Sequence, residues 1–482
     1  MKIKDNWNLP DLNEAGKRTR AAVERVDRFY IPANAVDMGK GKAAFISTYG
    51  CQANERDSET LAGILDILGY TLQDRPEGAD VILINTCAIR DNAMEKVLGE
   101  LGAYKRLYRQ NPELLIGVCG CMSQEDEFVR RVLEHYPWVH LLFGTHNIQD
   151  LPMLLLEARK ERTVKVYSRQ GEVYENLPVK RFGTHKAWVN IMYGCDKFCT
   201  YCIVPYTRGK QRSRTMDHIL EEVRQLKAEG YKEVTLLGQN VNAYGKDLEE
   251  PVSFARLLEE TARTGIDRVR FMTSHPWDFT PEMVDMIAKY PNIMPYIHLP
   301  LQSGDSEILR RMGRRYTAEE YKALFDLIKE KVPGAAISTD IIVGFPDESD
   351  EAFEHTLDMV RYCQFDLAYT FIFSPRPHTP AAKMEDPVDM ETKKARLQKL
   401  NQVWNEAALQ KMKAYEGRTV TVLVDGPSKK DARVYSGYTD TNKLVNFTGG
   451  NIQPGTLVDV VIDEAKTFSL NGHTTGGNDI IN

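Results

Sequence analysis

The chain has 482 residues, several times the usual size of a domain, so we expect two to four domains. Hydrophobic residues make up 42% of the chain and charged residues 27%, which excludes collagen-like, low-complexity and largely disordered proteins. The 62 lysines and arginines against 68 aspartates and glutamates give a net charge of −6, so the whole molecule does not attract nucleic acid and any RNA site must be local.

The first 41 residues are polar and contain no strand-forming runs, which predicts a loosely held leader. They resemble neither a signal peptide nor a transit peptide, and no run of about 18 apolar residues occurs in the chain. We therefore expect a cytoplasmic protein that does not enter a membrane. Because the cytoplasm keeps thiols reduced, the eight cysteines are not expected to form disulfides, and their spacing becomes informative.

Residues 42–158 alternate between short apolar runs and amphipathic stretches. The alternation predicts a first domain with a parallel α/β sheet. The predicted strands lie at 42–48, 79–85, 114–119 and 139–144, and the predicted helices at 55–68, 91–109 and 124–135. Residues 151–186 are poor in strands, with some β structure around 163–174, and are predicted to form a linker.

A second alternating region, the predicted core domain, spans residues 181–412. Six strand and helix units are too few for the usual eight-unit barrel, so we expect a partial (β/α)6 barrel. The strands are predicted at 188–193, 234–238, 268–273, 296–300, 336–343 and 366–373, and the helices at 216–229, 253–264, 280–289, 317–331, 349–361 and 390–413. Short alternating runs broken by Gly, Pro and Asn then predict a small antiparallel β-barrel over residues 413–476.

The strongest chemical signal is the C-x3-C-x2-C motif of Cys195, Cys199 and Cys202, directly after the first strand of the core domain. Three thiolates this close can hold one metal site and leave a coordination position free. Zinc is the weaker alternative, because a zinc site needs a fourth ligand and none stands nearby. Unligated thiols are the other alternative. Parallel α/β folds bind ligands at the carboxyl ends of their strands, where this motif lies.

A second set consists of Cys51, Cys87 and Cys121, each just past one of the first three predicted strands. Equivalent positions on successive parallel strands bring the three thiols to one edge of the sheet, which predicts a second metal site. Buried structural cysteines are the alternative. Cys119 still belongs to its strand, so Cys121 is the expected ligand, and Cys363 is expected to be a core residue.

The C-x3-C-x2-C motif, with aromatic Tyr201 before its third cysteine, resembles the cluster motif of the radical S-adenosylmethionine (SAM) superfamily. Together with the three-cysteine domain and a terminal barrel similar to the RNA-binding TRAM domain, it identifies the sequence as a member of the methylthiotransferase family. The resemblance covers residues 42 to about 473. The segments LLGQNVNAYG and FSPRPHTPAA are similar to the branch of the family that acts on tRNA.

This resemblance implies two [4Fe–4S] clusters, one on each cysteine set, and two SAM molecules per turnover. One SAM yields the radical that abstracts hydrogen from C2 of N6-(dimethylallyl)adenosine at position 37 of the anticodon loop. The other methylates a sulfur at the auxiliary cluster, and the 2-methylthio nucleoside results. Because a radical does this chemistry, no catalytic side chain is assigned. The implied partners are tRNA, an electron donor such as flavodoxin or ferredoxin, and a sulfur source, with the chain a monomer.

Two groups of side chains are expected around the SAM cluster. By resemblance, Tyr201 lies beside the adenine of SAM. Other polar residues stand at or after the ends of core strands and are expected to face SAM, with packing roles the equal alternative: Gln239, Asn240, Ser274, Gln302 and Asp340. Two basic segments near the barrel mouth are expected to hold RNA phosphates, with a solvated surface as the alternative: Arg208, Lys210, Arg212, Arg214, Arg314 and Arg315.

Three other functions compete with this one. Two stay within the family, methylthiolation of threonylcarbamoyl-adenosine in other tRNAs or of an aspartate in a ribosomal protein. The third is a non-catalytic iron–sulfur protein that binds RNA. The two tRNA-type segments favour the dimethylallyl substrate, and an open coordination position argues against a structural cluster, because structural metal sites are normally closed.

Overall fold

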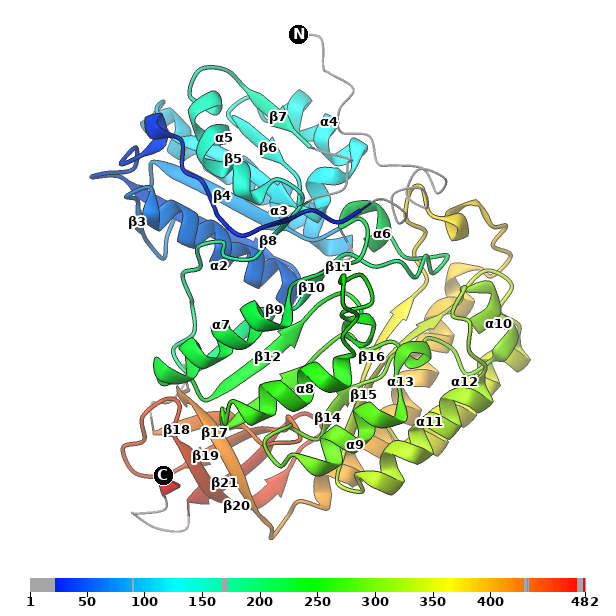
Figure 1. Ribbon diagram of the computed structural model, residues 1–482. Coiled ribbons are helices and arrows are strands. Elements are labelled where there is room, and N and C mark those ends of the chain that lie inside the picture. Colours follow the sequence, from blue (N-terminus) through cyan, green and yellow to red (C-terminus); the bar gives the residue numbers. More distant parts are fainter. Residues whose placement is uncertain are drawn as a thin grey trace.

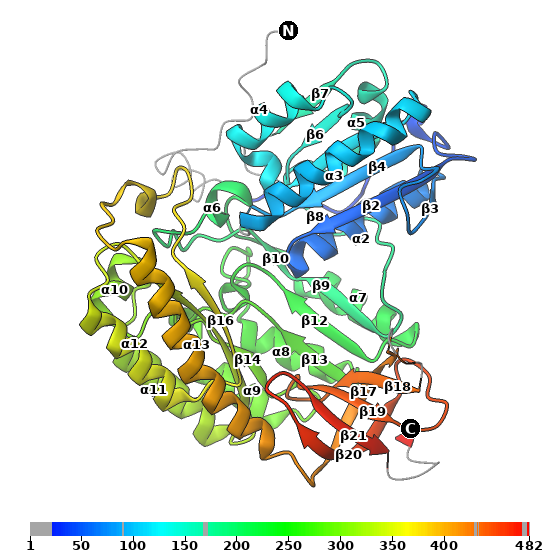
Figure 2. The same ribbon diagram turned by 180° about the vertical axis from the view of Figure 1, so that it is seen from behind.

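The computed structural model describes residues 22–88, 91–166, 172–428, 431, 433–474 and 480–481. Figures 1 and 2 show the amino-terminal domain at one end, the core domain in the middle and the terminal barrel at the other end. The first 21 residues of the predicted leader lie outside the described residues. For residues 22–41 the prediction of a loose leader is wrong, because strand β1 (Arg25–Val26) pairs with β8 (Val173–Tyr174) and the apolar side chain of Ala35 is buried against the first domain.

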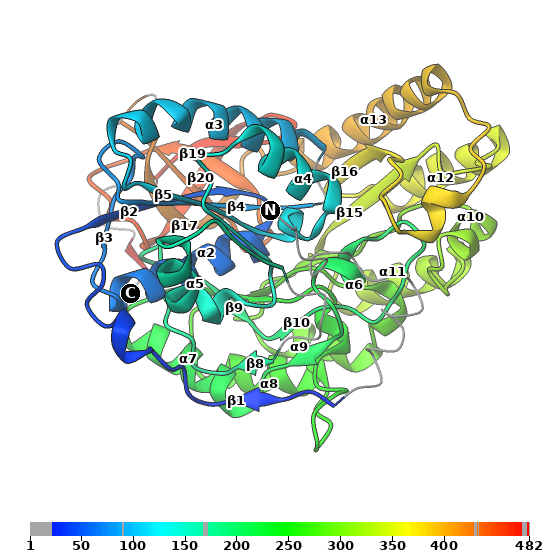
Figure 3. The same cartoon turned by 90° about the horizontal axis from the view of Figure 1, so that it is seen from above.

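The amino-terminal domain is a six-stranded sheet in which every pair of neighbours is parallel, in the order β3-β2-β4-β5-β6-β7. Helices cover both faces, as Figure 3 shows, with α2 and α5 on one side and α3 and α4 on the other. The strands are β2 Ala43–Tyr49, β3 Thr71–Leu72, β4 Val81–Thr86, β5 Leu115–Gly120, β6 Leu141–Phe143 and β7 Thr163–Lys165. The helices are α2 Gln52–Ile67, α3 Asp91–Gln110, α4 Asp126–His135 and α5 Leu151–Ala158. The sheet therefore extends past residue 158 into the segment predicted as a linker.

The core domain contains six parallel strands in two three-stranded ladders, β9-β12-β13 and β14-β15-β16. One parallel bridge between Val269 and Ile293 joins the ladders, and within the described chain no ladder joins β16 to β9. The predicted partial (β/α)6 barrel is thus confirmed. Its strands are β9 Lys186–Asn190, β12 Glu233–Leu237, β13 Arg268–Phe271, β14 Tyr296–His298, β15 Ala336–Val343 and β16 Leu367–Ile372. Its outer helices are α7 Met216–Ala228, α8 Phe254–Arg263, α9 Pro281–Lys289, α11 Ala318–Lys331, α12 Asp350–Cys363 and α13 Met390–Lys413.

Short elements add to this frame at the carboxyl ends of the core strands. They are the strands β10 (Met192–Tyr193) and β11 (Arg212–Ser213), which pair antiparallel, and the helices α6 (Val204–Thr207) and α10 (Ser306–Arg311). Cys363 ends α12 and is buried in the main hydrophobic core of this domain, as expected for a core cysteine. None of the described helices combines the length and apolar composition that a bilayer span requires.

The terminal domain is a closed barrel in the order β17-β18-β19-β21-β20, with β20 pairing back to β17. Four of the five pairs of neighbours are antiparallel and β19 with β21 is parallel. The strands are β17 Thr419–Pro427, β18 Val434–Tyr438, β19 Leu444–Thr448, β20 Leu457–Ala465 and β21 Leu470–Thr474, and β22 Ile480–Ile481 pairs with β20 outside the closed ring. Alternate side chains of these strands fill the barrel, which matches the period of two in the sequence.

The terminal barrel docks on the amino ends of the core strands, opposite the cysteine motif (Figure 1). Arg268, the first residue of β13, donates to the carbonyl oxygen of Tyr438 at 2.9 Å. Lys186, the first residue of β9, pairs with Asp425 at 2.5 Å. The barrel is therefore held by ion pairs and hydrogen bonds at the end of the core that is remote from the clustered thiols.

Candidate active site

The C-x3-C-x2-C motif forms a loop that follows β10 at the carboxyl ends of the core strands. Gly194, at φ +69°, allows the chain to turn into the loop, and a Cβ here would collide with the carbonyl oxygen of Lys210. The N–H of Cys195 donates to the carbonyl oxygen of Gly209 at 3.1 Å, and that of Cys202 to Cys199 at 2.9 Å. Backbone contacts therefore fix the three thiols on a short loop.

The chemistry of these three thiols suits an iron cluster. Burial and the neighbouring Cys199 raise the pKa of Cys202 to about 12, and the same two causes raise the pKa of Cys195. Three thiolates this close are unfavourable unless a cation compensates their charge. One guanidinium nitrogen of Arg314 lies 3.6 Å from the sulfur of Cys199. The donor set therefore fits a positively charged iron core that stabilises the thiolate forms.

Buried polar atoms beside this loop mark a place for a ligand. Among the atoms that find no hydrogen-bond partner within the described residues, four lie just past β12, β13 and β14: Asn240 Oδ1, Ser274 Oγ, His275 Nε2 and Gln302 Oε1. Buried polar groups in native proteins are nearly always paired, so such a cluster indicates an absent polar ligand. A polar molecule of the SAM type fits this arrangement, because it brings both donors and acceptors.

The predicted SAM-pocket residues differ in their surroundings. The side-chain oxygen of Asn240 is unpaired, whereas its side-chain nitrogen donates to Asp278 at 2.7 Å. The side chain of Gln239 accepts from the N–H of Gly194 and thereby supports the cysteine loop. Asp340 pairs with His298 at 3.4 Å, and Tyr201 packs against the apolar cluster around Met312. Ser274 and Gln302 are buried.

Sequence reasoning missed His275, which lies four residues past the end of β13. Its Nδ1 accepts from the N–H of Trp277 at 3.3 Å. Burial, together with Arg314 and Lys197, lowers the pKa of His275, so the ring is neutral near pH 7 and carries its proton on Nε2. The unpaired Nε2 thus offers a donor. Its position past the end of a core strand, beside Ser274, was the available signal.

The second set of thiols lies at the carboxyl ends of β2, β4 and β5, which are neighbours in the sheet. Cys51 is the residue before α2, Cys87 directly follows β4, and Cys121 begins the short 3-10 helix η2 (Cys121–Gln124). A hydrogen bond from Cys87, the charge of Arg208 and the N–H groups that open α2 outweigh burial and lower the pKa of Cys51 to about 5. Cys51 is therefore a thiolate at neutral pH, the form that binds iron.

The local backbone separates Cys121 from Cys119. Cys119 lies on β5, where it is buried in the apolar core beneath α2 and α5. Gly120, at φ +94°, turns the chain, and a Cβ there would collide with the side chain of Asn85. Cys121 instead joins a cluster with Ile203 and Tyr206 of the core domain. Cys121 is thus the cysteine of this pair that faces the core domain.

The two cysteine sets face each other across this shared apolar cluster. Ala88 and Cys121 come from the first domain, and Ile203 and Tyr206 follow Cys202 in the core domain, with Phe198 packed against them. In the described part of the chain no three His, Cys, Asp or Glu side chains are placed to hold a single metal ion. A cubane cluster bonds each cysteine to a different iron, so its ligands stand wider apart than those of one ion.

Comparison with known sequences identifies the family. Residues 189–360 match the Radical SAM superfamily, residues 43–144 match Uncharacterized protein family UPF0004, and residues 413–475 match the TRAM domain. A Geobacillus thermodenitrificans protein named tRNA-2-methylthio-N(6)-dimethylallyladenosine synthase is 57% identical over 96% of this chain and 89% of its own length. A Bacillus subtilis protein of the same name is 54% identical over 97% of this chain and 92% of its own.

The chain belongs to the tRNA-2-methylthio-N6-dimethylallyladenosine synthase family. The resemblance seen in the sequence is thereby confirmed. Among solved structures, the radical SAM methyltransferase TsrM from Kitasatospora setae, with tryptophan and a SAM analogue bound, has a TM-score of 0.53 at 14% identity, over 70% of this chain and 74% of that one. The same enzyme with cobalamin and a [4Fe-4S] cluster bound has a TM-score of 0.51 at 13% identity, over 70% of this chain and 77% of that one. At these identities the likeness shows the fold alone.

The prediction for the two basic segments is wrong for most of their residues. Four of the six predicted RNA contacts are buried and make contacts inside the protein, so the prediction that they form an RNA surface is wrong: Arg208, Arg212, Arg214 and Arg314. Arg208 pairs with Asp57 and Arg214 pairs with Glu175, which are distant in the sequence. Arg212 donates to the carbonyl oxygen of Arg208 and Arg314 donates to the hydroxyl of Tyr316, which are local contacts. The run of charges in the sequence does not reveal that these side chains are buried.

The two remaining residues, Lys210 and Arg315, line a cavity of about 510 Å³ beside the cysteine loop. Trp277 also lines the cavity and is half exposed. The nitrogen of Lys197 lies 3.8 Å from the centre of the Trp277 ring, and the guanidinium of Arg315 lies 5.0 Å from it. Basic groups around an exposed aromatic ring suit a nucleic-acid base with its phosphates. Trp277 was missed because nothing in the sequence distinguishes it from a packing residue.

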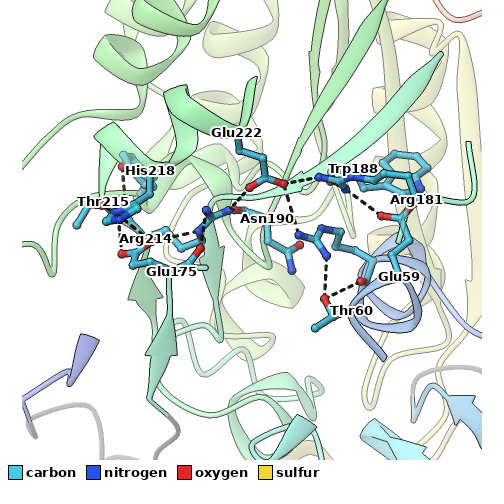
Figure 4. Close-up of polar contacts among 12 residues, drawn as sticks. Glu59, Thr60, Glu175, Arg181, Trp188, Asn190, Arg214, Thr215, His218 and Glu222 are labelled. Atoms are coloured by element: carbon cyan, nitrogen blue, oxygen red, sulfur yellow. Dashed lines mark hydrogen bonds and ion pairs between the residues drawn. The ribbon is translucent and has the colours of Figure 1, made fainter. Parts of the chain in front are cut away.

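A buried ion-pair network joins the two cluster-bearing domains, as Figure 4 shows. Glu222 on α7 accepts from Arg214 at 2.6 Å, from Arg181 of the linker, and from Arg56 on α2 at 3.4 Å. Arg181 also binds Glu59 on α2 at 2.9 Å. One carboxylate of the core domain thus holds side chains from three segments, and the network fixes α2 against the core.

Replacing Glu222 with glutamine is expected to reduce the free energy of unfolding by about 3 kcal/mol at pH 7, because the buried Arg56 and Arg214 and the partly buried Arg181 lose their shared partner. Burial opposes ionisation, yet Arg214, Arg56 and Arg181 lower the pKa of Glu222 to about 2. The stabilisation is present above the unfolded pKa of about 4.3 and is lost as the pH falls toward 2. Denaturant unfolding at pH 7 and pH 3 should show the difference from wild type shrinking at the lower pH.

The matched control is Glu221→Gln, which changes the neighbouring, exposed residue of α7. It should leave the free energy of unfolding within about 0.5 kcal/mol of wild type. An equal loss in both variants would show that Glu222 has no special part in the interface.

Proposed function

We propose that this chain is a radical SAM methylthiotransferase that converts N6-(dimethylallyl)adenosine of tRNA into the 2-methylthio nucleoside, at C2 of the adenine in the anticodon loop. Membership of a family named for this product supports the proposal. The observation that carries it is the placement of Cys121 and the segment after Cys202 in one apolar cluster. Two three-thiol sites facing each other suit a reaction in which one supplies a radical and the other a sulfur.

A [4Fe–4S] cluster and SAM are the cofactors of the Radical SAM superfamily. In this chain Cys195, Cys199 and Cys202 would hold the cluster, which when bound supplies the electron that cleaves SAM. The unpaired atoms of Asn240, Ser274, His275 and Gln302 would bind the polar groups of SAM and orient it. The apolar cluster beside the loop excludes water from the space where a radical must survive.

A second [4Fe–4S] cluster on Cys51, Cys87 and Cys121, and the use of two SAM molecules per turnover, are part of the proposal. The thiolate character of Cys51 supports the second cluster. Structural cysteines are inert and usually neutral, so a thiolate at Cys51, beside the strand ends that carry Cys87 and Cys121, favours a metal site. Cys51, Cys87 and Cys121 would hold this cluster, which when bound would supply the sulfur of the product.

The substrate is expected to enter through the cavity lined by Lys197, Lys210, Lys246, Trp277 and Arg315. Phosphates would contact the basic groups, and the ring of Trp277 would stack with a base. The terminal barrel lies at the other end of the core, so its contacts would be with a more distant part of the tRNA (Figure 1). Stacking through Tyr435 or Phe447 is not available, because both rings are buried in the barrel.

Replacing both Lys210 and Arg315 with alanine is expected to raise the KM for tRNA and leave SAM cleavage without tRNA unchanged. If each residue neutralises one phosphate, the slope of log affinity against log salt should fall by about two. Filter binding of tRNA at several salt concentrations measures the slope. The matched control replaces Arg256 and Lys289, two exposed cations on the outer helices α8 and α9, and should change nothing. Equal slopes in both double variants would exclude this cavity as the entrance.

The remaining partners are proposals of the same kind. A low-potential donor such as flavodoxin or ferredoxin would reduce the SAM cluster, and a sulfur source would renew the transferred atom. We propose that the chain acts as a monomer, because all six cysteines of the two sets belong to one chain, and in the cytoplasm, where thiols stay reduced, because these cysteines are free in the structure.

The function is tested with reconstituted, reduced protein and two tRNA preparations, one with the dimethylallyl group and one without it. Nucleoside mass spectrometry should detect the 2-methylthio product only in the first. Product on threonylcarbamoyl-adenosine tRNA or on a ribosomal protein instead would assign the chain to another methylthiotransferase, and absence of SAM cleavage would exclude the radical enzyme.

A further inference from the structure

Arg208 reaches from the core domain into the amino-terminal thiol site. It follows α6 directly, and its side chain is buried at the domain interface, with 6% of the residue exposed. Its Nη2 lies 2.7 Å from a carboxylate oxygen of Asp57 on α2, and its Nε lies 3.2 Å from the sulfur of Cys121. One guanidinium therefore touches both an acid and an expected cluster ligand of the other domain.

The placement of this charge is unlike that of the other buried arginines at the interface. Arg214 is equally buried, but its partners are Glu175 and Glu222 and it touches no thiol. The groups that attract the charge of Arg208 are the carboxylate of Asp57 and the sulfur atoms of Cys121 and Cys51. Arg208 has one carboxylate partner where Arg214 has two, and its Nε–H is directed at the sulfur of Cys121 instead of at a second acid.

We propose that Arg208 raises the reduction potential of the cluster held by Cys51, Cys87 and Cys121, with Asp57 acting in the opposite direction. This inference rests on the second cluster of the proposed function. Reduction adds an electron, so a fixed cation and an N–H donor to a ligating sulfur stabilise the reduced cluster more than the oxidised one. Arginine keeps its charge at any working pH, which makes it suitable for this role.

A consequence is that the core domain sets the electronic properties of the amino-terminal site. The cation comes from the loop that follows the SAM cluster motif, so its contact with Cys121 exists only when the two domains are docked. Separate domains would have a cluster with a lower potential, and reduction would be tied to correct assembly.

The test uses the full chain with Cys195, Cys199 and Cys202 changed to alanine, so that only the amino-terminal cluster can form. After anaerobic reconstitution, iron is counted and the potential is measured by redox titration with dithionite and mediators, followed by electron paramagnetic resonance. Arg208→Gln should shift the one-electron equilibrium at least tenfold toward the oxidised cluster, about 59 mV. Arg208→Lys should shift it less, because the charge remains.

Asp57→Asn and Arg214→Gln separate electrostatics from structural damage. Asp57→Asn should move the potential upward, opposite to Arg208→Gln, whereas loosening of the interface would move both in the same direction. Arg214→Gln loosens the same interface without touching a thiol and should leave the potential unchanged. If Arg208→Gln fails to bind iron, Asp57→Asn carries the test, and a potential that does not rise overturns the inference.

The outcomes distinguish this inference from the proposed second cluster. About four irons with an unchanged potential in Arg208→Gln would overturn the role of Arg208 and leave the cluster intact. No iron in the parent protein would overturn the amino-terminal cluster itself, and the role of Arg208 with it.

Discussion

Replacing Cys195, Cys199 and Cys202 with alanine will abolish the reductive cleavage of SAM and lower the iron content from about eight to about four atoms per chain. The reason is that these are the three cysteines of the loop at the carboxyl ends of the core strands, whereas Cys363, the other cysteine described in this domain, is buried in its hydrophobic core. No ordinary side chain supplies a low-potential electron, so nothing replaces the lost cluster. Anaerobic iron and sulfide analysis and chromatography of 5′-deoxyadenosine measure the two effects.

Cys363→Ala is the control for this variant, because Cys363 is a buried cysteine of the same domain far from the motif. It should retain the iron and the cleavage activity, with only a loss of packing energy. Cleavage of SAM by the triple variant would mean that the radical chemistry has been assigned to the wrong residues.

Replacing Cys51, Cys87 and Cys121 with alanine will leave SAM cleavage in place and abolish the methylthio product, with the iron again falling from about eight to about four. The thiols expected to hold the SAM cluster lie in the core domain, whose sheet and main hydrophobic core contain none of the three replaced cysteines. The variant would lose the site that is proposed to supply the sulfur of the product. Iron analysis, 5′-deoxyadenosine release and nucleoside mass spectrometry on one preparation give the three readouts.

Cys119→Ala is the matched control, since it removes a buried thiol two residues from Cys121 that packs beneath α2 and α5. It should retain both clusters and the product. About four irons in both the wild type and the triple variant would mean that the amino-terminal cysteines bind no cluster. The function would then have to be a radical reaction with a single cluster.

Only the tertiary structure decided which basic residues are accessible. The segment from Arg208 to Arg214 has the local composition of an RNA-binding surface, and the sequence predicted one. Arg208 pairs with Asp57, 151 residues earlier, and Arg214 pairs with Glu175, 39 residues earlier. A local pattern shows that a charge is present, but burial depends on which distant segment packs against it. For the same reason the sequence did not show that Nε2 of His275 is unpaired or that the ring of Trp277 is exposed.

The sequence by itself determined the three-domain order, the parallel sheets and the two sets of cysteines. These features are local, because strand and helix periods are read from neighbouring side chains. Cys51, Cys87 and Cys121 each follow their own apolar run, and Cys195, Cys199 and Cys202 form one short motif after a single run. The tertiary structure decided that Cys121 and the segment after Cys202 share one apolar cluster, and that Arg208 of the core domain contacts the thiol of Cys121. It also decided that the terminal barrel lies at the end of the core domain opposite the cysteine motif. Those facts depend on how separate domains dock, which no local period encodes.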